Sequence, residues 1–232
     1  MESAYWGKSY SHEDHKAAIE DYGYSYEYIE DINKVAEQMV DDMLDKRVIG
    51  LYQGRFEWGP RALGNRSIMA DPRRAEMKGI VNERIKFREP FGAFAPVVLE
   101  DRAPEFWEDL EDHKKTYPYR FMLSVCRTKP GQGDKIQAVD HEGSGRIQTV
   151  RREWNPLYYR AIELFGEATG VPVLLNTSFN LRGEPIVTTP TNALNTFTQS
   201  DIDTLYMDGF IVRKSQNKNR AIKKPEITFA KD

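Results

Sequence analysis

The chain has 232 residues, 40% of them hydrophobic and 30% charged, which excludes a disordered protein and suffices for a full hydrophobic core. Its formal net charge of −3 argues against a nucleic-acid partner, and its single cysteine excludes a disulfide framework within the chain. Because no apolar run approaches the ~20 residues that span a bilayer and no signal peptide is visible, we expect a cytoplasmic protein without a membrane partner.

The apolar residues alternate between helical and strand-like spacing, which is typical of an α/β domain. Ser11 and Asp14 form a capping box that predicts a short helix, and Ile32 to Asp45 has helical period. Val48 to Tyr52 is expected to be a short buried strand. Further helices are expected at 74–86, 155–170 and 190–199, further strands at 94–99, 121–125, 146–150, 171–175, 205–207 and 210–212, and a loop or hairpin insertion at 127–145.

No internal repeat and no linker divides the sequence. We therefore expect one α/β domain with a mixed sheet over residues 1–215. Residues 216–232 are rich in Lys, Arg, Asn and Gln and are expected to form a flexible basic tail.

Residues 54–73 are the most informative segment, because three glycines, two prolines and four arginines follow directly after the strand expected at 48–52. Glycine lets a backbone approach a ligand closely, and the arginine fork matches phosphate and carboxylate oxygens. The pattern indicates an anion site that uses Arg55, Arg61 and Arg66, rather than a surface loop with ordinary salt bridges. The absence of a Gly-Lys-Ser/Thr ending argues against a Walker-type phosphate loop.

A second polar segment, 176–180, follows the strand expected at 171–175 and supplies hydroxyl and amide groups. Ligands of α/β sheets bind outside the carboxyl ends of strands, although a turn that caps its own backbone would look the same. His141 precedes Arg146 by five residues and is the one histidine kept as a ligand candidate. Cys126 is expected in the core, so the sequence offers no convincing protein nucleophile.

Five motifs, in chain order, resemble one family. They are Gly-Pro-Arg-Ala-Leu-Gly-Asn-Arg-Ser at 59–67, Ala-Asp-Pro-Arg at 70–73, Phe-Ala-Pro at 94–96, Asn-Thr-Ser-Phe-Asn at 176–180 and Gly-Glu-Pro-Ile at 183–186. From about Tyr5 to Arg213 the sequence resembles the C-terminal domain of the O-carbamoyltransferases that modify nodulation factors and antibiotics. The resemblance implies a YrdC-like α/β fold, a twisted mixed sheet with flanking helices around a basic cavity.

The resemblance also implies a reaction in two steps. The C-terminal domain would bind carbamoyl phosphate and ATP, with Mg²⁺ inferred from the ATP, and would make carbamoyl adenylate and pyrophosphate. An N-terminal domain of the sugar-kinase/actin-like superfold, with its own metal site, would transfer the carbamoyl group to a hydroxyl. Nothing in this sequence resembles that domain, so we expect it as a partner in cis or in trans. This chain alone is expected to perform at most the adenylation.

YrdC-like domains use a basic pair and a Ser-x-Asn element, which Ser178-Phe179-Asn180 matches. Arg55 and Arg61 stand at the place of the basic pair, although a lysine is expected at the position of Arg55. The resemblance implies that Arg61 and Arg146 bind carbamoyl phosphate and that Arg55 binds the ATP phosphates or the same anion. The full expected site comprises catalytic Arg55, Arg61 and Ser178, and binding residues Arg66, His141, Arg146, Asn176 and Asn180, with Glu57 or Asp71 orienting an arginine.

Two other classes of function remain open. The first is a non-catalytic module that binds a nucleotide or carbamoyl phosphate. The second is an RNA-associated enzyme resembling threonylcarbamoyl-adenylate synthase, which uses bicarbonate and threonine in tRNA modification. The negative net charge and the lack of interleaved basic and aromatic residues argue against RNA binding.

Overall fold

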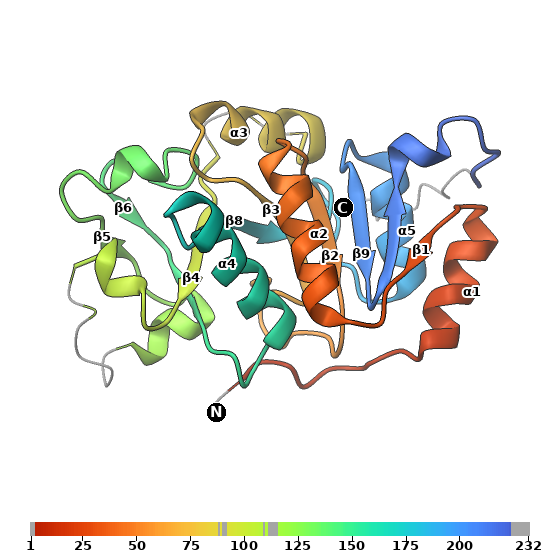
Figure 1. Ribbon diagram of the computed structural model, residues 1–232, viewed down its shortest axis with the longest axis horizontal. Helices are drawn as coiled ribbons and strands as arrows, with labels where there is room; N and C mark the ends of the chain where they lie inside the picture. Colours follow the sequence, from red (N-terminus) through yellow and green to blue (C-terminus); the bar gives the residue numbers. More distant parts are fainter. Residues whose placement is uncertain (1–2, 88, 90–91, 109, 111–115, 224–232) are drawn as a thin grey trace.

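The computed structural model describes residues 3–87, 89, 92–108, 110 and 116–223, which form an eight-stranded mixed sheet with helices on both faces (Figure 1). The strand order is β1-β10-β9-β2-β3-β8-β4-β7, in which β2 and β9, and β4 and β7, run parallel. The strands are β1 (Glu27–Tyr28), β2 (Ile49–Tyr52), β3 (Arg66–Ala70), β4 (Ala95–Leu99), β7 (Gln148–Val150), β8 (Val173–Ser178), β9 (Thr204–Met207) and β10 (Phe210–Arg213). A separate hairpin pairs β5 (Cys126–Arg127) with β6 (Ser144–Gly145).

The α-helices lie on two sides of the sheet. They are α1 (His12–Tyr22), α2 (Ile32–Leu44), α3 (Ala75–Ile80), α4 (Pro156–Thr169) and α5 (Pro190–Gln199). Helices α2 and α4 pack against each other and cover one face, as Figure 1 shows, whereas α1 and α5 belong to the core of the other face. Alternate side chains of each strand enter the two cores: in β8, Leu174 packs with α2 and α4, and Val173 and Leu175 pack on the opposite side. The expected α/β class, a mixed sheet with flanking helices, is confirmed.

Local signals placed several elements correctly. The capping box of Ser11 and Asp14 is formed at the start of α1. Asn155 caps α4, whose first residue is Pro156, and Gly170 ends this helix with a φ of 75°. The turn at 208–209 joins β9 to β10 as expected. Cys126 is buried, as expected for a core residue.

The strand expected over 121–125 is not formed. Residues Tyr117–Phe121 make a 3₁₀ turn that contains Pro118, and Met122 has a φ of 53°. The side chains of Leu123 and Val125 are 69% and 58% exposed. The apolar run therefore does not mark a buried strand, and pairing begins only at Cys126.

The segment 54–73, expected to be one anion-binding loop, divides into a loop and a strand. Its second part is β3, which lies between β2 and β8 in the centre of the sheet and is buried along its whole length. Because glycine and arginine are frequent just before Ser67, the short apolar run that follows is not predicted as a strand. Strand β8 is longer than expected and ends at Ser178, so Asn176 and Ser178 are strand residues.

The first part of the expected flexible tail packs against the domain. Asn217 Oδ1 accepts from the backbone N–H of Ser25 at 2.8 Å, and Arg220 Nε donates to the Gly23 carbonyl at 2.9 Å. The Lys223 N–H donates to the Tyr22 carbonyl at 3.0 Å. Residues 224–232 lie outside the described residues. Within the described part of the chain, no helix is long and apolar enough to cross a bilayer.

Candidate functional site

A cavity of about 520 Å³ lies at the C-terminal end of β8, where segments distant in sequence converge. They are the loop after β2, the end of the helix before β4, the start of β4, the β5–β6 hairpin and the loop after β8. The polar residues of the lining are Arg61, Lys86, His141, Ser144, Arg146, Asn176, Thr177, Ser178, Asn180 and Arg182. None of the described residues that line it is acidic, so this cavity is basic, as expected.

The register of the sheet explains why the end of β8 forms one wall. Leu174, Asn176 and Ser178 alternate onto the same face of the strand, and α2 and α4 cover only Leu174. Beyond the helices, the loop after β2 covers this face: Asn176 Nδ2 donates to the Ala62 carbonyl at 3.0 Å. The same Nδ2 donates to Gln148 Oε1 of β7 at 2.9 Å. Asn176 Oδ1 is buried without a hydrogen-bond partner.

Arg61 and Arg146 both line the cavity, one from the loop after β2 and the other from the residue after β6. Within the described residues, neither guanidinium makes a hydrogen bond or an ion pair. Partial burial lowers the pKa of Arg61, and the positive charge of Arg146 lowers this pKa further. Two cations close enough to repel each other form a site that an anion would stabilise.

Ser178 and Asn180 also reach the cavity, and both have internal partners. Their Oγ and Oδ1 atoms are hydrogen-bonded at 2.7 Å, and Asn180 Nδ2 donates to the Glu184 carbonyl at 2.6 Å. Glu184 Oε2 in turn accepts from the Leu181 N–H at 3.1 Å. The segment is therefore both a self-bonded turn and part of the cavity wall.

Lys86 is a cavity residue that sequence reasoning missed. Its buried ammonium donates to the Ser178 carbonyl and to the Asn180 carbonyl and Oδ1 at 3.1 and 2.8 Å. The helix expected over 74–86 continues past α3 as a π-helical turn, Val81–Ile85, which ends at Lys86. No sequence signal separated this lysine from the solvated ones, because its burial comes from the remote end of β8.

We expect Lys86→Met to lower the free energy of unfolding by about 1–3 kcal/mol, because buried carbonyl oxygens lose their cationic donor. Urea unfolding measures this change. Lys34→Met, on the exposed face of α2, is the control and should change the free energy by less than about 0.5 kcal/mol. Equal stability of the two variants would contradict the expectation.

The structure does not bring Arg55 and Arg66 to the cavity. Arg66 is fully buried as the first residue of β3; it donates to the Gln53 and Asn65 carbonyls at 2.6 and 2.8 Å and stacks on the Tyr52 ring. Arg55 donates from Nε to the Gly7 carbonyl at 2.9 Å. Both guanidinium groups bind backbone carbonyls and so hold the surrounding chain together.

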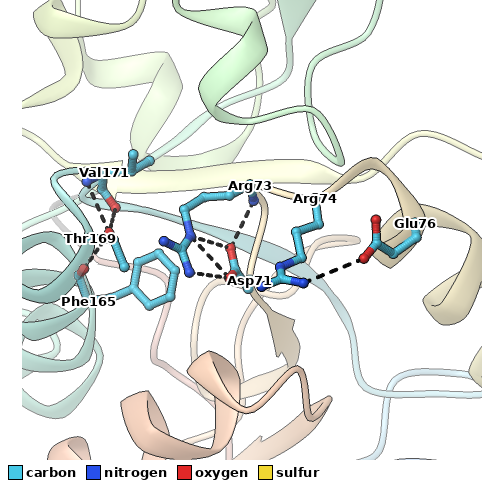
Figure 2. Close-up of polar contacts among 7 residues, drawn as sticks. All are labelled: Asp71, Arg73, Arg74, Glu76, Phe165, Thr169 and Val171. Atoms are coloured by element: carbon cyan, nitrogen blue, oxygen red, sulfur yellow. Dashed lines mark hydrogen bonds and ion pairs between the residues drawn. The ribbon is translucent and has the colours of Figure 1, made fainter.

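Of the two carboxylates expected to orient an arginine, Asp71 does so. It accepts from Arg73 Nε and Nη2 at 3.0 and 2.7 Å, and Arg73 lies over the Phe165 ring of α4, as Figure 2 shows. Neither Asp71 nor Arg73 lines the cavity. This pair therefore joins the end of β3 to α4.

Glu57 binds backbone instead of an arginine. Its carboxylate is buried, and Oε1 accepts from the N–H groups of Leu63 and Asn65 at 2.6 and 2.7 Å. Burial raises the pKa of Glu57 from its ordinary 4.5 to about 7, and the two N–H groups and the charge of Arg66 limit this rise.

The raised pKa predicts a pH dependence of stability. Because the folded-state pKa is above the unfolded one, the protonated carboxyl favours the folded state. This contribution is complete below pH 4.5 and is lost as the pH rises to about 7. We expect the stability of Glu57→Gln relative to the wild type to rise across this window, as measured by urea unfolding at several pH values. A constant difference would contradict the shift.

Comparison with known proteins places these features in a family. Residues 40–214 match the family model described as the carbamoyltransferase C-terminus. The chain is 46% identical to the nodulation protein NolO of Bradyrhizobium diazoefficiens over 181 residues, 78% of this chain and 32% of that protein. It is 44% identical to the 3'-hydroxymethylcephem-O-carbamoyltransferase of Amycolatopsis lactamdurans over 143 residues, 61% of this chain and 26% of that enzyme. The chain thus spans about a third or less of these relatives.

A solved structure shares the fold. Full-length HypF, in its phosphate- and nucleotide-bound form, superposes with a TM-score of 0.52 at 14% identity, over 84% of this chain and 26% of HypF. This likeness supports the YrdC-like fold that the motifs imply. The family model covers more than half of the sequence. Its range contains the motifs at 59–67 and 176–180 and the cavity residues Arg61, Lys86, Arg146 and Ser178. The chain therefore belongs to the carbamoyltransferase C-terminal family.

Proposed function

We propose that this chain is the activating domain of an O-carbamoyltransferase, which binds carbamoyl phosphate and ATP in the basic cavity and makes carbamoyl adenylate. The observation that carries the proposal is the pair Arg61 and Arg146, which face a cavity whose described lining includes no carboxylate. The matching family model and the cephem O-carbamoyltransferase support a carbamoyl transfer as the overall reaction.

The proposed chemistry brings two anions together. Carbamoyl phosphate and water give carbamate and inorganic phosphate. A carbamate oxygen then attacks the α-phosphorus of ATP, and the bond from this phosphorus to the bridging oxygen breaks, so that pyrophosphate leaves. Arg61 and Arg146 would offset the repulsion between the reactants and position them, which is the main contribution of a protein to such transfers. Asn180 Nδ2 has a second N–H that would donate to the phosphate or the carbamoyl group, and Ser178 Oγ would donate there after releasing Asn180 Oδ1.

The amide of Asn176 holds a hydrogen-bond acceptor that no described residue uses. Its Nδ2 is committed to the Ala62 carbonyl and to Gln148 Oε1, which fixes the amide orientation and leaves the buried Oδ1 as an unused acceptor. A carbamoyl N–H can pair with this oxygen, and so can the O–H of bicarbonate or the ammonium group of threonine. The requirement of the exchange reaction for carbamoyl phosphate, and not Asn176, therefore separates the two activities.

The cavity fits the phosphates of ATP better than a metal held by the protein. No group of three or more His, Cys, Asp or Glu side chains that could bind a metal occurs among the described residues. Mg²⁺ would therefore enter as part of the ATP substrate, bound to its phosphates. The transfer to a hydroxyl would need the second domain implied by the family resemblance, in the same or in another chain.

Exchange of radiolabelled pyrophosphate into ATP tests the proposal. We expect exchange by the full chain that requires carbamoyl phosphate, with no exchange when bicarbonate and threonine replace it. Nucleotide binding without exchange would instead indicate a binding module. Exchange that requires bicarbonate and threonine would indicate a threonylcarbamoyl-adenylate synthase.

A further inference from the structure

A buried carboxylate joins the two ends of the loop that carries Arg61. Glu57 Oε1 accepts from the N–H groups of both Leu63 and Asn65, at 2.6 and 2.7 Å, so residues 57 and 63–65 are joined across the loop. Residues 60–62, which line the cavity, lie between these points. One carboxylate oxygen thus holds two backbone amides at the base of the loop from which Arg61 projects.

We propose that Glu57 is a positioning residue, which acts through the backbone of residues 57–65 to direct the guanidinium of Arg61 at an anion in the cavity. This inference rests on the proposed function in one respect: both require that Arg61 binds an anion in the cavity.

The side chain of Arg61 depends on this backbone because it has no other anchor. It is exposed and forms no hydrogen bond or ion pair with any described residue, so no neighbour fixes its direction. On the cavity side, the loop is tied to the sheet where the Ala62 carbonyl accepts from Asn176. Tyr5 and Gln148 also hold the Leu63 carbonyl, at 2.8 and 2.9 Å, so loss of Glu57 would loosen the backbone of residues 57–62 without releasing the whole loop. Precise placement of charge gives an anion contact its strength, so a small displacement of Arg61 would weaken it.

The carboxyl of Glu57 can hold the loop in either protonation state. The charged and titratable groups near it are Arg66 of β3, Tyr5 of the N-terminal segment and Tyr158 of α4. Its second oxygen, Oε2, is buried without a partner and can carry a proton while Oε1 still accepts both N–H groups. Glutamine has the same acceptor in the same place, whereas alanine has none and aspartate is shorter by one methylene.

Sulfate binding to the full chain, measured by calorimetry, tests the proposal. Sulfate keeps its charge over the pH range of Glu57 and needs no chemistry from the protein. We expect Glu57→Ala and Glu57→Asp to weaken sulfate binding about tenfold, as Arg61→Ala does, and Glu57→Gln to stay within threefold of wild type. In the Arg61→Ala background, Glu57→Ala should cause no further loss. Asp42→Ala, which removes a buried carboxylate outside the cavity, is the control for lost stability and should bind like wild type.

Hydrogen exchange of the wild-type chain gives a second measurement that needs no variant. If sulfate binds only while Glu57 holds the Leu63 and Asn65 amides, saturating sulfate slows hydrogen exchange at these two amides at least tenfold. Exchange at the amides of α2 stays unchanged. Unchanged exchange at these amides, additive losses in the double variant, or full binding by folded Glu57→Ala would overturn the proposal, as would wild-type protein that binds no sulfate. A chain that meets these expectations but gives no pyrophosphate exchange would refute only the proposed function.

Discussion

Arg61→Ala is expected to lower carbamoyl-phosphate-dependent pyrophosphate exchange by about 10- to 100-fold, because one charge-assisted contact to a bound anion contributes about 1.5–3 kcal/mol. Arg61 is the candidate with the largest expected effect, since it has no structural partner among the described residues and its loss removes a ligand contact without removing an internal bond. Initial rates at saturating ATP and varied carbamoyl phosphate measure the change.

Arg74→Ala is the matched control for this experiment. Arg74 belongs to the same arginine-rich part of the chain, but it pairs with Glu76 outside the cavity at 3.8 Å, as Figure 2 shows. We expect this variant to exchange pyrophosphate within about twofold of wild type, because exposed ion pairs contribute little. An Arg61→Ala enzyme as active as Arg74→Ala would remove Arg61 from the proposed mechanism.

Gly64→Ala is expected to give the largest loss of stability. Gly64 has a φ of +108°, and a Cβ at this position would lie 2.4 Å from Cδ1 of the buried Tyr158 ring. Overpacking costs about 1–3 kcal/mol, and a backbone conformation reserved for glycine costs about another 1–3 kcal/mol. For a protein of this size each 1 kcal/mol shifts the Tm by about 2–4 °C, so thermal unfolding should detect the change readily.

Gly79→Ala is the matched control. Gly79 is a helical glycine of α3, and a Cβ added there would meet no atom within 4 Å. Alanine should therefore leave stability unchanged or raise it by about 0.5–1 kcal/mol. If the two variants had the same Tm, the close packing of Gly64 on Tyr158 would be wrong.

Helices and strands whose ends are marked by residues within the element itself could be predicted from the sequence. Those that depend on contacts with distant parts of the chain could not. Asn155, Pro156 and Gly170 mark both ends of α4 with residues whose caps and φ angles act within one turn. In contrast, β3 lacks such signals, because its strand character comes from pairing with β2 and β8. The same holds for Lys86, which is a helix-end lysine in sequence and a buried donor only next to Ser178.

The candidate site followed the same division. Arg61, Asn176, Ser178 and Asn180 could be predicted together because the motifs at 59–67 and 176–180 are specific, whereas Arg146 lies in a segment that matches the family less well. The structure brings all five residues to one cavity. Arg66 stands in the same motif as Arg61, but the motif crosses from a loop into a strand between the two. Composition alone does not reveal where the strand begins, so it does not separate the arginine that faces the cavity from the arginine that supports it.

The parallel pairing of β2 with β9 bears on the order in which the molecule can form during synthesis. Ile49 lies beside Thr204, so the middle of the sheet closes a chain segment of about 150 residues. Contacts of such long separation form slowly, because the entropy of the intervening chain is lost before the contact stabilises it. When β2, β3 and β8 have been synthesised, β2 still lacks its second neighbour, β9, and so has one unpaired edge. The growing chain therefore exposes the edge of β2 to aggregation until the hairpin of β9 and β10 has been synthesised. Pairing of this hairpin with β2 is the step that completes the sheet.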